Sequence, residues 1–242
     1  MSKRTLWFAV LCVAMAVLCV RLGFWQLGRL GERRARNAVV RARLDLPVVA
    51  LAALPADSAT VRFRRAETRG RYDYAREVKL AGRSRNGSPG VHIVTPLRVE
   101  GAGDTVVLVN RGWVYSPDAA TATLERWRER DTATVRGFVD VFPAPGPGAA
   151  RAASDPRAYR WLDRDEMARL VGAPVAPVVL VAQGDTAGTA ANRTPVRLDP
   201  PPLDEGPHWN YAVQWFAFAG VSIAGLAAVL SAERRKARAP RG

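Results

Sequence analysis

The sequence predicts a membrane-anchored α+β protein, in which two transmembrane helices flank a mainly antiparallel, β-rich soluble domain. Leu6 to Val20 form one uninterrupted apolar run, and Tyr211 to Leu230 form a second run with few polar side chains. The helices expected around these runs, 5–27 and 210–230, are long enough to cross roughly 30 Å of hydrocarbon. From Val61 onward, apolar residues recur at every second position, which is typical of strands.

The first helix is expected over residues 5–27, after a cytoplasmic tail over 1–4. Two basic residues precede its apolar run, as in a signal peptide, but no small-x-small cleavage site follows it. Trp7 and Trp25 are eighteen positions apart. That spacing corresponds to roughly 27 Å along a helix, near the two faces of a bilayer. We therefore expect a retained anchor rather than a cleaved leader.

Beyond the first span, a basic juxtamembrane helix and a linker are expected over residues 28–60. The segment from Gly23 to Asn37 keeps helical spacing while it becomes rich in arginine, so the helix is expected to continue into the headgroup region. Arg21 lies inside the apolar boundary, where snorkelling to the interface explains it and a functional role stays open. The apolar stretch between Pro47 and Pro55 is too short to cross a bilayer.

The β-rich extracytoplasmic domain is expected over residues 61–198. Segments with a period of two, separated by turn signals, predict an antiparallel meander. These segments are Val61–Tyr74, Glu77–Arg85, Gly90–Glu100 and Asp104–Tyr115. The further expected elements are a helix from Ser116 to about Glu129, a strand over Thr132–Phe142, a short helix from Asp163 to Val171 and a strand over Pro174–Ala182. Ser116 is expected to cap the first of these helices, and Gly172 to end the second.

A proline-rich tether over 199–209 leads into the second expected span, 210–230, and a basic cytoplasmic tail follows over 231–242. Acidic residues precede this span, whereas arginines and a lysine follow it. Because basic residues favour the cytoplasmic side, this contrast favours both termini inside and the domain outside. The sequence therefore predicts a multi-pass inner (cell) membrane protein with a periplasmic or extracytoplasmic domain.

The composition excludes some classes of function. A formal charge of +14 and a pI near 11.1 suggest nucleic acid, but no basic stripe interleaved with stacking aromatics is present, so no nucleic-acid partner is expected. Arginines beside the spans are instead expected to attract anionic lipid headgroups. Cys12 and Cys19 both fall in the first span, so no disulfide or CxxC chemistry is expected.

The residues offer little for catalysis, and no enzyme activity is expected. His92 is expected to be structural because it lies in a predicted strand. His208 lies about one turn outside the second apolar run, where a neutral imidazole can bind a metal or haem iron. An interfacial histidine without a ligand is the alternative. A stripe of polar, aromatic and small residues on the second helix is expected to pack against the first span. It consists of Tyr211, Gln214, Phe218, Ser222 and Gly225.

Four motifs occur in a specific order along the chain. They are GFWQLGRLGERR after the first span, VHIVTPL after a turn, VLVNRGWV in mid-domain and HWNYAVQWFAFA at the second span. In this order and layout the chain resembles the SURF1 (Shy1) family of cytochrome c oxidase assembly factors. The resemblance covers both ends and the centre of the chain. It implies a chaperone in respiratory chain biogenesis that binds haem a transiently and assists its insertion into subunit I of a haem-copper oxidase.

Carried over by position, the resemblance implies that His208 ligates the haem iron at the mouth of the second span. The other cofactor-binding residues that it implies are Tyr211, Gln214, Trp215, Trp25, Gln26 and Arg29. Gln26 and Arg29 end one span on the side where the other begins, so these groups are expected to converge with His208. Arg21 or Arg29 is expected to pair with the haem propionates. The domain motif comprises Asn110, Arg111, Gly112 and Trp113, which we interpret as a strand end with a buried indole.

Two other functions stay open at this point. The first is a cofactor-free membrane scaffold that stabilises an oxidase assembly intermediate. The second is a membrane-tethered envelope hydrolase, which would need His92 as its base. The partners implied by the resemblance are subunit I of cytochrome c oxidase and proteins of haem a synthesis or assembly, in addition to membrane lipids.

Overall fold

A computed structural model describes residues 3–55, 57–144, 151–152, 155–184 and 194–238. The chain forms two units, one from Met1–Val40 with Leu203–Gly242 and one from Arg41–Pro202. The loops predicted after Phe142 and after Ala182 lie partly outside the described residues, as do the two ends of the chain.

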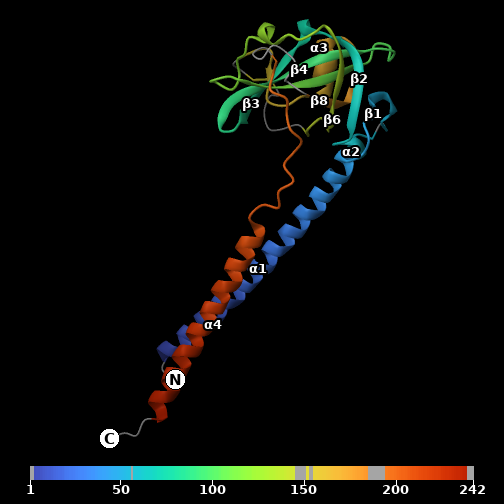
Figure 1. Ribbon diagram of the computed structural model, residues 1–242. Coiled ribbons are helices and arrows are strands. Elements are labelled where there is room, and N and C mark those ends of the chain that lie inside the picture. Colours follow the sequence, from blue (N-terminus) through green and yellow to red (C-terminus); the bar gives the residue numbers. More distant parts are fainter. Residues whose placement is uncertain (1–2, 56, 145–150, 153–154, 185–193, 239–242) are drawn as a thin grey trace. The chain divides into compact units, whose positions relative to one another are not determined.

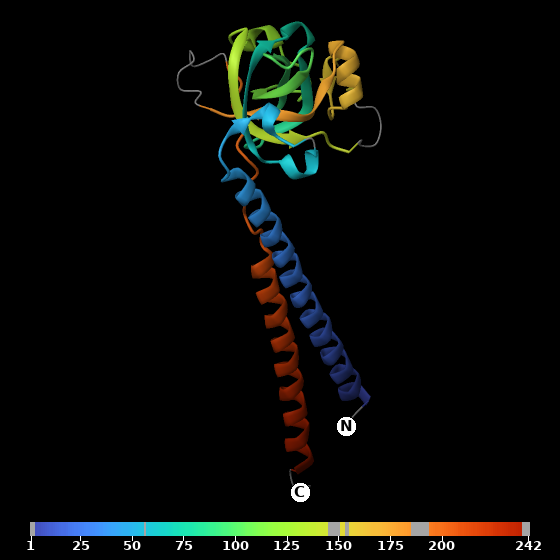
Figure 2. The same ribbon diagram turned by 90° about the vertical axis from the view of Figure 1, so that its right-hand side faces the viewer.

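The helical unit contains helix α1 (Lys3–Leu44) and helix α4 (His208–Arg238), which run side by side and antiparallel (Figures 1 and 2). Thr5 donates a hydrogen bond to Glu233 at one end of the pair. Helix α1 is unbroken over 42 residues, about 63 Å, so the expected continuation of the first span as a basic helix is confirmed. Both helices are long and apolar enough to cross a membrane.

One stripe of each helix forms the contact. On α1 the buried residues recur at intervals of three and four, as expected for a single helix face. The central ones are Ala16, Cys19, Gly23, Gln26 and Leu30, and Thr5 and Val40 are buried nearer the two ends of the helix. On α4 the buried residues are Ala212 and Ala219. Between them the ring of Phe216 lies over Gly23 and forms a T-shaped pair with Phe24, with the ring centroids 5.4 Å apart. Small residues on both sides let the two backbones approach closely.

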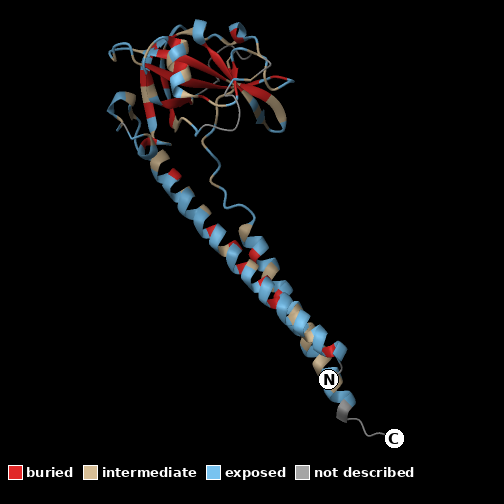
Figure 3. Ribbon diagram, turned by 180° about the vertical axis from the view of Figure 1, so that it is seen from behind, coloured by how far each residue is buried: buried red, intermediate tan, exposed pale blue. Residues whose placement is uncertain are grey.

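The stripe predicted for this contact on α4 is wrong in its first half. Tyr211, Gln214 and Phe218 are exposed, and only Ser222 and Gly225 are partly buried. The contact face is rotated toward Ala212, Phe216 and Ala219, because Gly23 lacks a side chain and so leaves room for the ring of Phe216. Outside this contact both helices are largely exposed, as the pale blue ribbons of Figure 3 show, and most of their exposed side chains in the two apolar runs are apolar.

The second unit is built on an eight-stranded sheet with the order β1-β2-β6-β8-β5-β4-β3-β7. Its strands are β1 (Val49–Ala50), β2 (Arg65–Tyr72), β3 (Val78–Arg85), β4 (Ser88–Val99), β5 (Val106–Tyr115), β6 (Thr132–Val141), β7 (Ala158–Tyr159) and β8 (Val175–Ala182). Its short helices are α2 (Ser58–Val61), α3 (Arg164–Val171) and the 3-10 helices η1 (Leu51–Ala53), η2 (Tyr74–Arg76) and η3 (Leu124–Trp127). The predicted β-rich domain, mainly antiparallel, is confirmed.

A further pairing closes part of this sheet into a barrel. The end of β4 pairs with the end of β2, through Tyr72 opposite Leu97 and Gly70 opposite Val99. Strands β2, β6, β8, β5 and β4 therefore form a closed ring, with β3 extending from β4. The predicted antiparallel meander is confirmed for β3, β4 and β5 and wrong for β2, which pairs with β4 and β6 instead of β3. Strand β8 inserts between β6 and β5 and runs parallel to β5.

Strands β5 and β8 have apolar side chains on both faces. Val107 and Val109 belong to the core cluster that also contains Leu180, whereas Leu108 belongs to a second cluster with Met167 of α3. Successive side chains of a strand point to opposite faces, so an unbroken apolar run fits a strand that is covered on both. This explains why both strands read as continuous runs of valine and leucine.

Two predicted helices have different outcomes. Helix α3 has its predicted bounds. The Asp163 carboxylate caps its start by accepting a hydrogen bond from the Glu166 N–H at 2.8 Å, and Gly172 ends it in a left-handed conformation at φ 71°. The helix predicted from Ser116 to Glu129 is wrong, and only η3 forms there. The side chain of Asp118 accepts hydrogen bonds from the backbone of Ala120 and Thr121, and these local bonds compete with a helix.

Candidate functional site

Gln26 and His208 meet where the two helices of the helical unit face each other. Gln26 belongs to the buried stripe of α1 and is 9% exposed, and His208 is the first residue of α4. The His208 Nδ1 and the Gln26 Oε1 are 2.9 Å apart. Because an amide oxygen only accepts, Nδ1 carries the proton and donates it to this bond. The imidazole is therefore held in the tautomer whose Nε2 has a free lone pair.

The residues before His208 leave space beside that nitrogen. Gly206 has φ 67°, a left-handed conformation that favours glycine. A Cβ atom at this position would lie 3.7 Å from His208 Nε2, so glycine keeps this side of the ring open. Pro207 lies just before α4, and its carbonyl accepts from the Tyr211 N–H at 3.1 Å, which fixes the first turn.

Two ion pairs fasten the start of α4 to α1. Arg34 forms two hydrogen bonds of 2.8 Å with Glu205, and Arg33 binds both the backbone carbonyl and the carboxylate of Asp204. The hydrogen bond from Arg34 lowers the pKa of Glu205. We name these four residues the interhelical latch. The sequence predicts that these arginines attract lipid headgroups, and it uses the carboxylates only to infer the membrane orientation. It does not predict the ion pairs between them.

The other predicted site residues lie on exposed or partly exposed faces of the same helices. Trp25 is 55% exposed, and Arg29, one turn further along α1, pairs with Glu32 at 2.6 Å. Tyr211 and Gln214 are exposed, and Trp215 is half-buried with its ring edge toward Phe218. Within the described residues, none of these side chains forms a hydrogen bond with His208. The structure thus brings together Gln26 and His208 of the predicted set.

The donor set of this site suits a haem better than a bare metal ion. Among the described residues, no group of three or more His, Cys, Asp or Glu side chains could hold an ion. A haem needs only an axial donor from the protein, because its macrocycle fills the equatorial positions. His208 offers one free ring nitrogen, Gly206 leaves room beside it, and exposed aromatic faces are available from Trp25, Trp209 and Tyr211. The residues present therefore fit one face of a haem.

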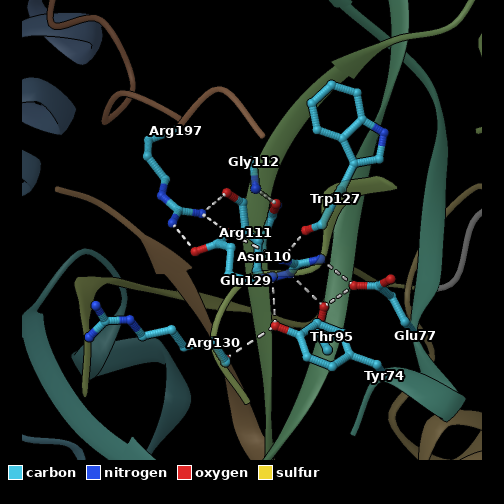
Figure 4. Close-up of polar contacts among 10 residues, drawn as sticks. All are labelled: Tyr74, Glu77, Thr95, Asn110, Arg111, Gly112, Trp127, Glu129, Arg130 and Arg197. Carbon is cyan, nitrogen blue, oxygen red and sulfur yellow. Dashed lines mark hydrogen bonds and ion pairs between the residues drawn. The ribbon is translucent and has the colours of Figure 1, made fainter. Parts of the chain in front are cut away.

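The domain motif around Arg111 has a structural role instead. The Arg111 side chain is fully buried, and Figure 4 shows it at the centre of a polar network. Its guanidinium donates to Thr95 Oγ1 at 2.8 Å, to the Trp127 carbonyl at 2.6 Å and to the carboxylates of Glu77 and Glu129. Burial raises the pKa of Glu77, and the charge of Arg111 opposes that rise. We call Arg111 and these four partners the buried network.

The buried network also anchors the segment that follows the last strand. Arg197 donates to the Arg111 carbonyl and to Glu129, the latter at 2.6 Å (Figure 4). Val196 and Trp113 exchange backbone hydrogen bonds of 2.8 Å. Gly112, at φ 130°, lies directly against the Val196 carbonyl, where a side chain would collide. The interpretation of this motif as a strand end with a buried indole missed its principal group, which is the arginine.

His92 has the environment of a structural histidine. Its Nδ1 lies 3.3 Å from the Asn110 Nδ2, while the Asn110 Oδ1 accepts from the Gly112 N–H. Burial first, and then the nearby charge of Arg83, lower the pKa of His92 to about 4. No serine, threonine or cysteine side chain is hydrogen-bonded to His92 among the described residues. The geometry therefore gives no support to a hydrolase that uses His92 as its base.

Comparison with known proteins identifies relatives along most of the chain. The model of the SURF1 family matches residues 13–220. A SURF1-like protein of Rickettsia felis is 26% identical over 217 residues, which cover 87% of this chain and 90% of the relative. Surfeit locus protein 1 of Mus musculus is 23% identical over 233 residues, 89% of this chain and 72% of the relative. A SURF1-like protein of Drosophila melanogaster is 28% identical over 236 residues, 89% and 74% of the two chains.

Proposed function

This chain belongs to the SURF1 family, and on that premise we propose that it is a membrane-anchored, non-enzymatic assembly factor for a haem-copper oxidase. In this proposal it binds haem a transiently as cargo at His208 and assists its insertion into subunit I. Proteins of haem a synthesis would supply the cargo. When bound, the haem supplies the redox-active iron that the oxidase needs, whereas the chain itself only holds and releases it.

Membrane anchoring is supported by the surface of the two long helices. Their apolar stretches expose large side chains such as Trp7, 74% exposed, and Val221, 69% exposed. Water-exposed apolar surface of this extent is unfavourable, and lipid would cover it. We place the first span within 5–27 and the second within 210–230. Both termini then lie in the cytoplasm and the β domain lies outside the inner membrane.

This orientation is supported by charge. Lys3 and Arg4 precede the first span, and Arg234, Arg235 and Lys236 follow the second, so the terminal ends are basic. At the opposite ends, the interhelical latch neutralises two arginines with two carboxylates. A cysteine placed at Glu100, in a variant without Cys12 and Cys19, should react with an impermeant maleimide on the periplasmic side. Labelling of a cysteine at Arg234 instead would contradict the orientation.

The hydrogen bond between His208 and Gln26 is the observation that carries the ligand assignment. Metal-binding histidines commonly donate their second ring N–H to an oxygen acceptor, which fixes the tautomer and orients the ring. Here that acceptor comes from the other helix, so the two helices together fix Nε2 as the free ring nitrogen, and Gly206 places no side chain beside it. A single axial donor at a half-buried position also suits a cargo that must leave again.

The test compares haem content and absorption spectra of proteins purified in detergent from cells that make haem a. We expect wild type to carry haem a with the spectrum of an imidazole-ligated haem, and His208→Ala to lose it. His92→Asn changes the other histidine and should retain both. Equal haem content and identical spectra in wild type and His208→Ala would refute the assignment, and would favour the cofactor-free scaffold that holds subunit I through the exposed apolar helix faces.

A further inference from the structure

The β domain contains a cavity of about 920 Å³ that the proposed haem function does not use. It is lined by three arginines, Arg62, Arg83 and Arg85, and by several aromatic side chains. All of its lining residues lie between Arg62 and Pro202, so it belongs to the second unit by itself. A volume of this size is within the usual range for small-molecule sites in proteins.

Arg83 carries a charge that nothing in the described part of the domain neutralises. Its Nη2 donates to the Arg160 carbonyl at 3.2 Å, and its Nε is buried without a hydrogen-bond partner. Burial alone lowers the pKa of Arg83, with no carboxylate raising it. Arg62 differs, because it pairs with Asp140 at 2.9 Å on the same cavity wall. A partly buried guanidinium without a counter-ion is costly, and an anion in the cavity would offset that cost.

A second donor faces the same cavity. The Asn110 Oδ1 accepts a hydrogen bond from the Gly112 N–H, which fixes the orientation of the amide. The Asn110 Nδ2 therefore faces the His92 Nδ1, and since an amide nitrogen only donates, this ring nitrogen accepts the hydrogen bond. Since burial keeps His92 neutral at physiological pH by holding its pKa at about 4, the remaining ring nitrogen, Nε2, carries the proton. Both the Arg83 guanidinium and the His92 imidazole belong to residues that line this one cavity.

The remaining wall is apolar and partly aromatic. It includes Trp113, Trp161 and Phe138, together with Leu162 and Val179. A simple inorganic anion would leave this surface in contact with water. An anion with a flat apolar body would bury it, and aromatic pairing would add to the gain from the buried area.

We propose that this cavity is a binding site for an organic anion, in which Arg83 holds a carboxylate and the aromatic wall holds an apolar body. The site is separate from the haem site at His208 and does not depend on it, because its lining contains no residue of α1 or α4. The domain would thereby bind a second, small ligand of its own.

The test uses the full-length protein in detergent and three probes. Indole-3-acetate has both the carboxylate and the aromatic body, indole-3-acetamide lacks the charge, and acetate lacks the body. Binding is followed by the tryptophan indole N–H signals in two-dimensional NMR, with the signals of Trp113 and Trp161 assigned by substitution with phenylalanine. We expect indole-3-acetate to shift these two signals at concentrations at least tenfold lower than either of the other probes.

A matched pair of variants tests the role of the guanidinium. Arg83→Gln should weaken indole-3-acetate to the level of the amide. Arg136→Gln removes an exposed arginine that pairs with Glu67 and does not line the cavity, and it should leave binding unchanged. Equal binding of the acid and the amide to wild type would overturn the proposal, even if Arg83→Gln does not fold. Shifts confined to the tryptophans of the helices, or no shifts of Trp113 and Trp161, would overturn it as well.

Discussion

Replacing Arg111 with methionine tests whether the buried network stabilises the domain. The substitution would leave Glu77, which is 1% exposed, without the cation that pairs with it. Removal of one partner of a buried ion pair costs about 3–5 kcal/mol, because the other charge stays buried and uncompensated. For a protein of this size, such a loss corresponds to a fall in Tm of about 6–20 °C. Thermal unfolding of the full chain in detergent, followed by near-UV circular dichroism, measures it.

Two further variants separate this mechanism from a general loss of arginine. Arg136→Met removes a guanidinium that is 71% exposed, and its pair with Glu67 should contribute no more than about 1 kcal/mol. The double substitution of Arg111 by Met and Glu77 by Leu should recover much of the loss, because no unpaired charge then remains. Equal losses for the two single arginine variants, or a double variant as unstable as the sum of its parts, would refute this reasoning.

The pH dependence of the Arg111 variant gives an independent check. Burial raises the pKa of Glu77 above its ordinary value of 4.5, and Arg111 opposes this. Without Arg111 that pKa rises further, so the folded state retains a proton that the unfolded state has released. A group of this kind stabilises the fold at low pH and loses its contribution as the pH rises through the folded pKa. The stability deficit of Arg111→Met should therefore be smallest below pH 4.5 and grow toward neutral pH.

The other predictions concern the two histidines. Gln26→Leu should weaken haem a binding by roughly 10–100-fold in a Soret titration, because it removes the acceptor that orients His208, whereas Cys19→Ala on the same buried stripe should not. Equal effects of both would indicate helix packing instead. His92 has a folded pKa of about 4 against an ordinary 6.5, so the wild type should lose about 3 kcal/mol of stability as the pH falls through this window. In His92→Gln the loss between pH 6.5 and 4 should be smaller by that amount, and an unchanged loss would exclude His92 as its source.

Local chemistry made parts of the fold predictable from the sequence. Period-two patterns and the capping pair Asp163 and Gly172 depend on neighbouring residues, so strands β3 to β6 and helix α3 could be located. The closure of the barrel and the insertion of β8 between β6 and β5 depend on pairings between distant segments, which periodicity does not encode. The helix expected after Ser116 failed for a local reason, because the Asp118 side chain takes the backbone donors that a helix would need.

The two sites differ in how far sequence reasoning can reach them. At the helical site, His208 can be predicted because it is a conspicuous donor at the end of a span. The pairing of Arg33 and Arg34 with Asp204 and Glu205 joins residues 171 positions apart, so sequence reasoning does not reach it. In the domain cavity the informative feature is that Arg83 has no carboxylate counter-ion among the described residues, and a sequence rich in arginine offers no sign of which one lacks a counter-ion. Of the two carboxylates that line the cavity, Asp140 is already paired with another arginine, and Asp199 forms no ion pair with Arg83. Only the packed arrangement distinguishes a paired arginine from an unpaired one, and the cost of a partly buried charge without a counter-ion is what favours an anion in the cavity.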